Sequence, residues 1–318
     1  MQKYRRVSSI LDRPLRAGIL AAADNAFVRR AVTRYGMRLG ARRFVAGESV
    51  AQLLAAAHAA NAEGFAVAAT LLGESVRDRD ETLAVTAEYC RLLEAFAQGG
   101  FDANVAFKLT HVGLDIDTEL AFENASTIVA AAAKYGNTVR MDMEQSRYVD
   151  RTLEIYRRLR ADRANAGFVL QSYLYRSEGD LTATISLGPN VRIVKGAYLE
   201  PPEIAYPHKR DVDANYLKLA ELALSNDGYT AIATHDPRIV EHVTRFAAAR
   251  GLPKKGRFEF QMLYGIATPL ARRVLDRGYR IRLSIPYGEY WFPYLMRRLA
   301  ERPANVAFFL RGAFSPNT

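Results

Sequence analysis

From Phe65 onward the sequence alternates between short apolar runs and longer amphipathic stretches, and this unit recurs eight times. Each unit predicts a buried strand followed by a helix, because of the lengths and spacings of its apolar residues. The predicted strands are Phe65–Leu72, Asn104–Thr110, Thr138–Met143, Gly167–Ser172, Val191–Gly196, Tyr229–His235, Arg257–Gln261 and Tyr279–Ile285. Eight consecutive units favour a closed parallel (β/α)8 barrel of the TIM type over an open doubly wound sheet. No GxGxxG motif, the usual mark of the open sheet, occurs.

The segment that precedes the first predicted strand has a different texture. Ser8–Ala62 is rich in Ala, Arg and Leu, with apolar residues at helical spacing, which predicts an all-helical arm. A chain of 318 residues can bury one large core. We therefore expect two parts, an N-terminal helical arm at 1–64 and a catalytic barrel at 65–318.

Charge and cysteine content limit the classes of partner without choosing one. Lys and Arg number 44 against 34 Asp and Glu, and this excess favours anionic ligands, an anionic membrane surface or nucleic acid. The single cysteine, Cys90, permits neither an internal disulfide nor a multi-cysteine metal site. Four histidines lack the spacing of metal ligands, and we expect no metal: His58, His111, His208 and His242.

Apolar stretches in this chain are too short for a bilayer span, which requires roughly 18 to 20 consecutive apolar residues. The N-terminus also lacks the uncharged apolar run of a signal peptide. We therefore expect a cytoplasmic protein whose contact with a membrane, if there is one, is peripheral and at its inner face.

Polar residues gather at the ends of the predicted strands. In chain order they are Lys108, Asp142, Gln171, Arg192, Lys195, Thr234 and His235. Barrel enzymes place their chemistry at the C-terminal mouth, so these side chains are expected to converge on one cavity. Buried charges are costly unless paired or bound, which leaves two interpretations open: a charged ligand or an internal ion-pair network.

Seven segments, spread in order from about Gly73 to the C-terminus, resemble those of FAD-dependent proline dehydrogenases of the monofunctional bacterial type. They read FKLT, DME, LQSYLYR, VKGAY, ATHDPR, FEFQMLYG and PYLMRRLAERP. The resemblance implies a flavoenzyme that oxidises L-proline to 1-pyrroline-5-carboxylate by hydride transfer to FAD and passes the electrons to a membrane quinone. It also implies that the last helix lies over the mouth of the barrel.

The same resemblance implies a substrate site. Lys108 is expected to grip the substrate carboxylate together with Arg297 and Arg298, since planar guanidinium forks and an ammonium suit a carboxylate. Tyr198 and Leu263 are expected to form the apolar walls. On residue pattern alone, a pair of adjacent arginines is also compatible with solvated surface, and the two apolar residues with core packing.

A gate over the substrate is a further expectation. Glu74, at the end of the first predicted strand, would pair with Arg297 and close over the bound ligand. A carboxylate that caps the following helix is the alternative.

On the flavin side, the resemblance implies that Arg192 lies near the isoalloxazine ring and that Gln171 binds its pyrimidine edge. The other cofactor residues implied are Met143, Val194, Lys195, Gly196, Ala197, Thr234 and His235. Taken singly, Gly196 and His235 are also compatible with a loop glycine and a core histidine. Asp142 matches the family's essential acid, and both an orienting role and a general-base role remain open.

One position departs from the family pattern. Proline dehydrogenases usually carry a tyrosine two residues before the proline that ends the eighth strand, and here Ser284 occupies that position. The smaller side chain opens volume and adds a hydroxyl, which suggests trans-4-hydroxy-L-proline as an alternative substrate. Refilling of the space by Tyr287 or another aromatic residue is the competing explanation.

Two other classes of function remain to be weighed. A flavin-free barrel lyase or aldolase would use Lys108 or Lys195 as a Schiff-base nucleophile. A basic RNA-binding protein would need a recognisable nucleic-acid module, and the sequence contains none, so we expect no nucleic-acid partner.

Overall fold

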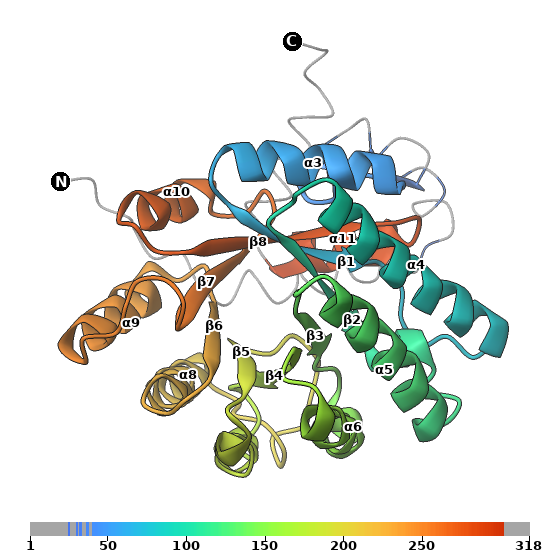
Figure 1. The fold of residues 1–318 in the computed structure, drawn as a ribbon. Coiled ribbons are helices and arrows are strands. Elements are labelled where there is room, and N and C mark those ends of the chain that lie inside the picture. The colour runs from blue at the N-terminus through green and yellow to red at the C-terminus, as the bar shows by residue number, and fades with distance from the viewer. Residues whose placement is uncertain (1–24, 26–29, 31, 34–35, 38–39, 302–318) are drawn as a thin grey trace.

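The computed structural model describes residues 25, 30, 32–33, 36–37 and 40–301. Its strands form a closed barrel in sequence order, every neighbouring pair is parallel, and β8 pairs with β1 (Figure 1). The strands are β1 Ala66–Leu71, β2 Ala103–Lys108, β3 Val139–Asp142, β4 Ala166–Gln171, β5 Asn190–Val194, β6 Tyr229–Ala233, β7 Phe258–Leu263 and β8 Ile281–Tyr287. The predicted (β/α)8 barrel is confirmed.

Strand boundaries differ from the prediction where a turn begins early. β5 ends at Val194 rather than Gly196, because Gly196 has φ 106° and turns the chain away from the sheet. β6 ends at Ala233 rather than His235, since the Thr234 hydroxyl accepts a hydrogen bond from the Asp236 backbone N–H at 3.1 Å. In contrast, β7 continues two residues beyond its predicted end, to Leu263.

Helices surround the barrel (Figure 1). They are α3 Val50–Ala62, α4 Arg79–Gln98, α5 Thr118–Lys134, α6 Val149–Asp162, α7 Ser177–Thr182, α8 Lys209–Leu224, α9 Pro237–Ala249, α10 Thr268–Asp276 and α11 Trp291–Glu301, with short 3-10 turns η1 Ala41–Arg43, η2 Leu109–Val112, η3 Ser146–Tyr148 and η4 Ile185–Leu187. Asp78, Asp117 and Asp236 begin α4, α5 and α9 by accepting hydrogen bonds from their first-turn N–H groups. In the part of the chain that is described, no helix is long and apolar enough to cross a membrane.

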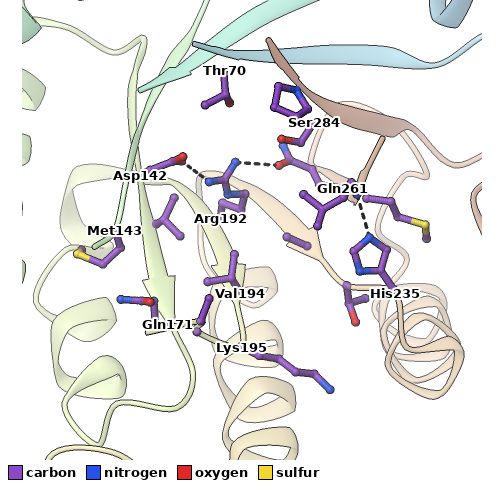
Figure 2. A pocket seen from close by; sticks show the side chains of 18 of the residues that line it. Thr70, Asp142, Met143, Gln171, Arg192, Val194, Lys195, His235, Gln261 and Ser284 are labelled. Atoms are coloured by element: carbon purple, nitrogen blue, oxygen red, sulfur yellow. Dashed lines mark hydrogen bonds and ion pairs between the residues drawn. The ribbon is translucent and has the colours of Figure 1, made fainter. Parts of the chain in front are cut away.

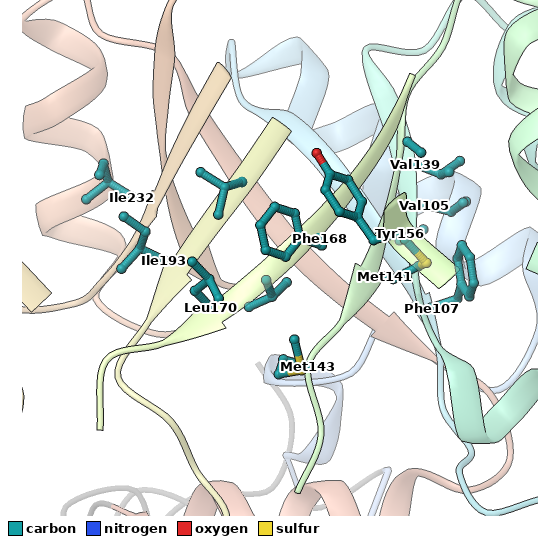
Figure 3. Close-up of a cluster of buried hydrophobic side chains, with 14 of the residues drawn as sticks. Val105, Phe107, Val139, Met141, Met143, Tyr156, Phe168, Leu170, Ile193 and Ile232 are labelled. Carbon is teal, nitrogen blue, oxygen red and sulfur yellow. The ribbon is translucent and has the colours of Figure 1, made fainter. Parts of the chain in front are cut away.

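The main core lies between the strands and the outer helices (Figure 3). Successive residues of a strand face opposite sides, so Phe107, Met141 and Phe168 pack outward while their neighbours face the barrel interior. The rings of Phe168 and Tyr156 on α6 lie 4.2 Å apart. Leu53 on α3 joins the same core, although the predicted division at residue 64 stays a prediction, since most of 1–39 lies outside the described residues.

A second, smaller core lies at the C-terminal ends of the strands. In it Trp291 and Leu295 of α11 pack with Leu72, which follows β1, and Ile266, which follows β7. The Trp291 indole N–H donates to the Glu48 carboxylate at 2.7 Å. These contacts place the last helix over the mouth of the barrel, as predicted.

Candidate functional site

A cavity of about 700 Å³ opens at the C-terminal mouth (Figure 2). Every strand contributes to its lining, and the contributions include Thr70, Lys108, Asp142, Gln171, Arg192, Ala233, Gln261 and Ser284. The volume is in the range of small-molecule sites. The predicted convergence of polar strand ends on one cavity is thus observed.

Arg192 occupies the centre of this cavity and is held from two sides (Figure 2). Its Nη2 forms an ion pair with Asp142 Oδ1. Its Nη1 donates to Gln261 Oε1 at 3.4 Å. Its Nε is buried and donates to none of the described residues, which leaves one polar atom of a fixed cation without a partner inside the site.

The predicted carboxylate clamp is only partly described. Lys108 lines the cavity and forms an ion pair with Glu74. Arg298 reaches the same cavity from α11, and its guanidinium carbon lies 5.2 Å from the centre of the Tyr294 ring. The side chain of Arg297 lies outside the described residues. The proposed gate between Glu74 and Arg297 therefore stays a prediction.

The remaining predicted substrate and cofactor residues also line the cavity. They are Tyr198, Leu263, Ser284, Met143, Gln171, Val194, Lys195, Gly196, Ala197, Thr234 and His235. Gly196 has a local structural reason as well: a Cβ built on it would approach the Tyr173 ring to 2.2 Å. The Leu263 backbone N–H donates to His235 Nε2 at 2.9 Å, so the proton of the neutral imidazole sits on Nδ1.

Backbone contacts orient the amide of Gln171. Its Nε2 donates to the Glu144 carbonyl oxygen at 2.8 Å. Its side chain is 2% exposed, and Oε1 accepts no hydrogen bond from a described residue. Gln171 consequently offers the cavity an acceptor at a fixed position.

Acidic partners engage both lysines that a lyase would need. Lys195 contacts Asp213 on α8 at 2.5 Å and Asp236 at 3.7 Å, and Lys108 contacts Glu74. A Schiff-base lysine must attack as the neutral amine, whereas these contacts use the ammonium. The geometry therefore disfavours the lyase interpretation.

Sequence reasoning missed several groups of the site. Gln261, Lys209, Asp236 and Thr70 line the cavity, and Asp213 lies behind Lys195. Gln261 could have been found, since it ends a predicted strand in the FEFQ segment. Asp213 could not, because it lies 18 residues from Lys195 and only the packing of α8 brings the two together.

A parallel β/α barrel with a cationic cavity at its C-terminal mouth defines a TIM-barrel enzyme whose residues are suited to an anionic ligand. The family model described as proline dehydrogenase matches residues 53–311. The chain belongs to the proline dehydrogenase family and is an oxidoreductase.

Two relatives match over nearly their whole length. The chain is 42% identical over 308 residues to proline dehydrogenase of Deinococcus radiodurans, covering 95% of this chain and 99% of the relative. It is 39% identical over 298 residues to proline dehydrogenase 1 of Bacillus subtilis subsp. natto, covering 94% and 98%. These identities confirm the resemblance seen in the sequence segments.

A solved structure shares the fold. Proline utilization A (PutA) from Bdellovibrio bacteriovorus, inactivated by N-propargylglycine, superposes with a TM-score of 0.78 at 24% identity. The alignment covers 95% of this chain and 40% of that one, so the chain spans less than half of that protein. At this identity the similarity supports the barrel fold alone.

Proposed function

We propose that this proline dehydrogenase binds FAD in the cavity and oxidises L-proline to 1-pyrroline-5-carboxylate. The observation that carries the proposal is the fixed, incompletely partnered Arg192 at the centre of the cavity. A guanidinium held in this way stabilises negative charge on a bound ring without having to reorganise.

The residues around Arg192 fit a flavin. Gln171 presents its carbonyl oxygen, which suits the N3–H donor on the pyrimidine edge of the ring. Gly196 and Ala197 add little bulk to the wall beside it. Bound FAD would supply the two-electron acceptor for the hydride that leaves the ring carbon next to the proline nitrogen.

The clamp side of the cavity suits the proline carboxylate. Lys108 and Arg298 reach the cavity from β2 and from α11 over the mouth, so a carboxylate between them would be fixed from two directions. Arg297 is proposed to join them. Because Glu74 already engages Lys108, substrate binding has to displace or share that contact.

Asp142 is proposed to orient rather than to act as a base. Its carboxylate is engaged by Arg192, and removing it would loosen the cation that faces the cofactor. The substrate nitrogen needs only to be neutral before hydride leaves, and solvent can take that proton.

Absorption spectroscopy tests the cofactor directly. The purified protein should show a flavin band and lose it when proline is added under anaerobic conditions. Arg192→Met should weaken FAD binding or slow this bleaching at least tenfold. Wild-type protein that stays colourless after incubation with FAD would rule the proposal out.

We further propose a membrane quinone as the electron acceptor, with peripheral contact to the membrane surface. The family resemblance and the net charge of +10 support it, since a basic surface is attracted to anionic lipid. Steady-state turnover with a short-chain quinone should exceed turnover with oxygen, and flotation should depend on anionic lipid. Equal rates with both acceptors would contradict the quinone proposal.

A second candidate substrate, trans-4-hydroxy-L-proline, is favoured by Ser284. The side chain lines the cavity from the middle of β8, where it adds a small donor and acceptor. Tyr287 does not refill the space, because it is buried at 1% exposure and is not part of the cavity wall. Tyr294, on α11, remains as an aromatic wall.

The ratio of kcat/KM for the two substrates decides between them. Ser284→Tyr should shift this ratio towards proline by tenfold or more, since a steric block rejects an added hydroxyl strongly. Ser284→Ala is the control, because it keeps the volume and removes the hydroxyl. A wild type that strongly prefers proline, together with an unchanged ratio in Ser284→Tyr, would end the hydroxyproline candidate.

A further inference from the structure

Beneath the cavity, the barrel interior contains a layer of buried charge. Arg140, Glu259 and Arg282 lie on β3, β7 and β8, each two residues before a residue that lines the cavity. Their exposed fractions are 2%, 1% and 7%. Because alternate residues of a strand face the same side, this layer lies directly under Asp142, Gln261 and Ser284.

Glu259 is the acid of this layer, and four donors converge on it. Oε1 accepts from Arg282 Nε at 2.8 Å and from Gln261 Nε2 at 2.6 Å. Oε2 accepts from the Tyr229 hydroxyl at 3.0 Å and from Arg280 Nε at 3.3 Å. So many donors are satisfied only by an ionised carboxylate.

The charge state of Glu259 follows from these contacts. Burial alone would raise the pKa of Glu259, but the charge and hydrogen bond of Arg282, with help from Arg140 and the Gln261 amide, lower it to about 2. At any working pH, Glu259 accepts hydrogen bonds and does not donate them.

This charge state fixes the orientation of Gln261. Glu259 can only accept, so Gln261 must turn its NH₂ group towards it. Arg192 can only donate, so Gln261 must turn its side-chain carbonyl oxygen towards Arg192. An amide between an acceptor-only group and a donor-only group has one orientation, because flipping it would pair donor with donor and acceptor with acceptor.

We propose that Glu259 and Gln261 act as a relay that positions Arg192 for the bound flavin. In this relay, Glu259 orients the Gln261 amide, and Gln261 is the positioning residue that holds Arg192. Asp142 holds one terminal nitrogen of Arg192 and the relay holds the other. The guanidinium plane is thereby constrained at two points. This inference rests on the proposed flavin role of Arg192.

Gln261→Met tests the relay, because it removes both ends of the amide at similar length. The rate constant for flavin reduction by saturating proline should fall roughly fivefold to tenfold, since an Arg192 held at one point is less well placed. The proline dissociation constant should stay within about twofold, because Lys108 and Arg298 are untouched. The flavin midpoint potential should also fall, by about 30 mV for each tenfold decrease in the equilibrium constant for two-electron reduction of the flavin.

Tyr229→Phe is the matched control. It removes a hydrogen bond to the other oxygen of Glu259 and leaves the contact with Gln261 in place. Its reduction rate and midpoint potential should equal those of the wild type. If Gln261→Met and Tyr229→Phe behave alike in both measurements, the relay is wrong.

A double-mutant cycle tests the role of Glu259. Glu259→Gln leaves Gln261 free to flip, so it should slow flavin reduction in the wild-type background and have no further effect on that rate in Gln261→Met. Equal effects in both backgrounds would overturn the relay. If Glu259→Gln does not fold, Gln261→Met against Tyr229→Phe still decides.

The flavin band separates the two proposals. Wild-type protein without it refutes the flavin proposal. Wild-type protein that binds FAD and is bleached by proline, with a Gln261→Met variant of unchanged rate and potential, refutes the relay alone.

Discussion

Glu144 should make this protein less stable as the pH rises through neutrality. Its side chain is 3% exposed, and its carboxyl oxygens accept from the Thr110 backbone N–H at 3.1 Å and from the Thr110 hydroxyl at 2.7 Å. Burial raises the pKa of Glu144 from 4.5 to about 7, against the lowering effects of these hydrogen bonds and of Lys108. Glutamine at this position keeps the shape and does not titrate.

The size and sign of the effect follow from linkage. The folded state binds the proton more tightly than the unfolded state, so the contribution of Glu144 is fully favourable below pH 4.5 and is lost as the pH rises through about 7. The interval from 4.5 to about 7 at about 1.36 kcal/mol per pH unit gives about 3 kcal/mol. For a chain of 318 residues, the part of this loss between pH 5 and 8 corresponds to about 4 °C in Tm.

Calorimetric Tm measured from pH 5 to 8.5 tests this. Relative to Glu144→Gln, the wild type should lose about 4 °C across that range. Glu119→Gln is the control. Glu119 is exposed, and the hydrogen bond from Arg158 lowers the pKa of Glu119. Replacing it should therefore leave the fall in Tm between pH 5 and 8.5 unchanged. Parallel Tm profiles for wild type and Glu144→Gln would refute the assignment of this loss to Glu144.

Three further predictions concern the site. Arg298→Ala should raise the KM for proline tenfold or more while FAD stays bound, as a lost charged hydrogen bond costs about 1.5 to 3 kcal/mol; an unchanged KM would exclude Arg298 from the clamp. Gly196→Ala should lower Tm and FAD affinity, because φ is 106° and the added Cβ meets the Tyr173 ring, whereas Gly179→Ala, with nothing within 4 Å, should not lower them. Asp142→Asn should lower kcat at least tenfold and leave the KM for proline within about threefold, and the opposite pattern would indicate a substrate-binding role.

The barrel and the location of its site could be predicted from the sequence, because both depend on local patterns. Short apolar runs alternate with helical ones, and parallel strands in a closed barrel bring their C-terminal ends together. The positions of Lys108, Gln171 and Arg192 at the ends of predicted strands are therefore enough to predict that they share one cavity. Strand limits were wrong where a turn residue such as Gly196 acts before the apolar run ends, and where β7 and β8 each continue two residues beyond the predicted end.

Partners of these side chains could not be predicted, because they come from other elements. Glu74 follows β1 and pairs with Lys108 on β2, and Asp213 on α8 pairs with Lys195. No spacing rule relates such residues, because the number of residues between the two partners differs from pair to pair. Strand alternation alone predicts that Glu259 points into the barrel. Its ion pair with Arg282, however, depends on the neighbouring strand and could not be predicted from the local pattern.

The alternatives that the sequence left open, a charged ligand or an internal ion-pair network, turn out to be compatible. Arg192 pairs with Asp142, Lys108 with Glu74 and Lys195 with Asp213, so the described cations at the strand ends have acidic partners. These partners lower the cost of burying the cations and hold them in place before a ligand arrives. In the proposed clamp, the proline carboxylate would compete with Glu74 for Lys108, so Glu74→Gln should tighten proline binding. Weaker proline binding in Glu74→Gln would instead favour the gate.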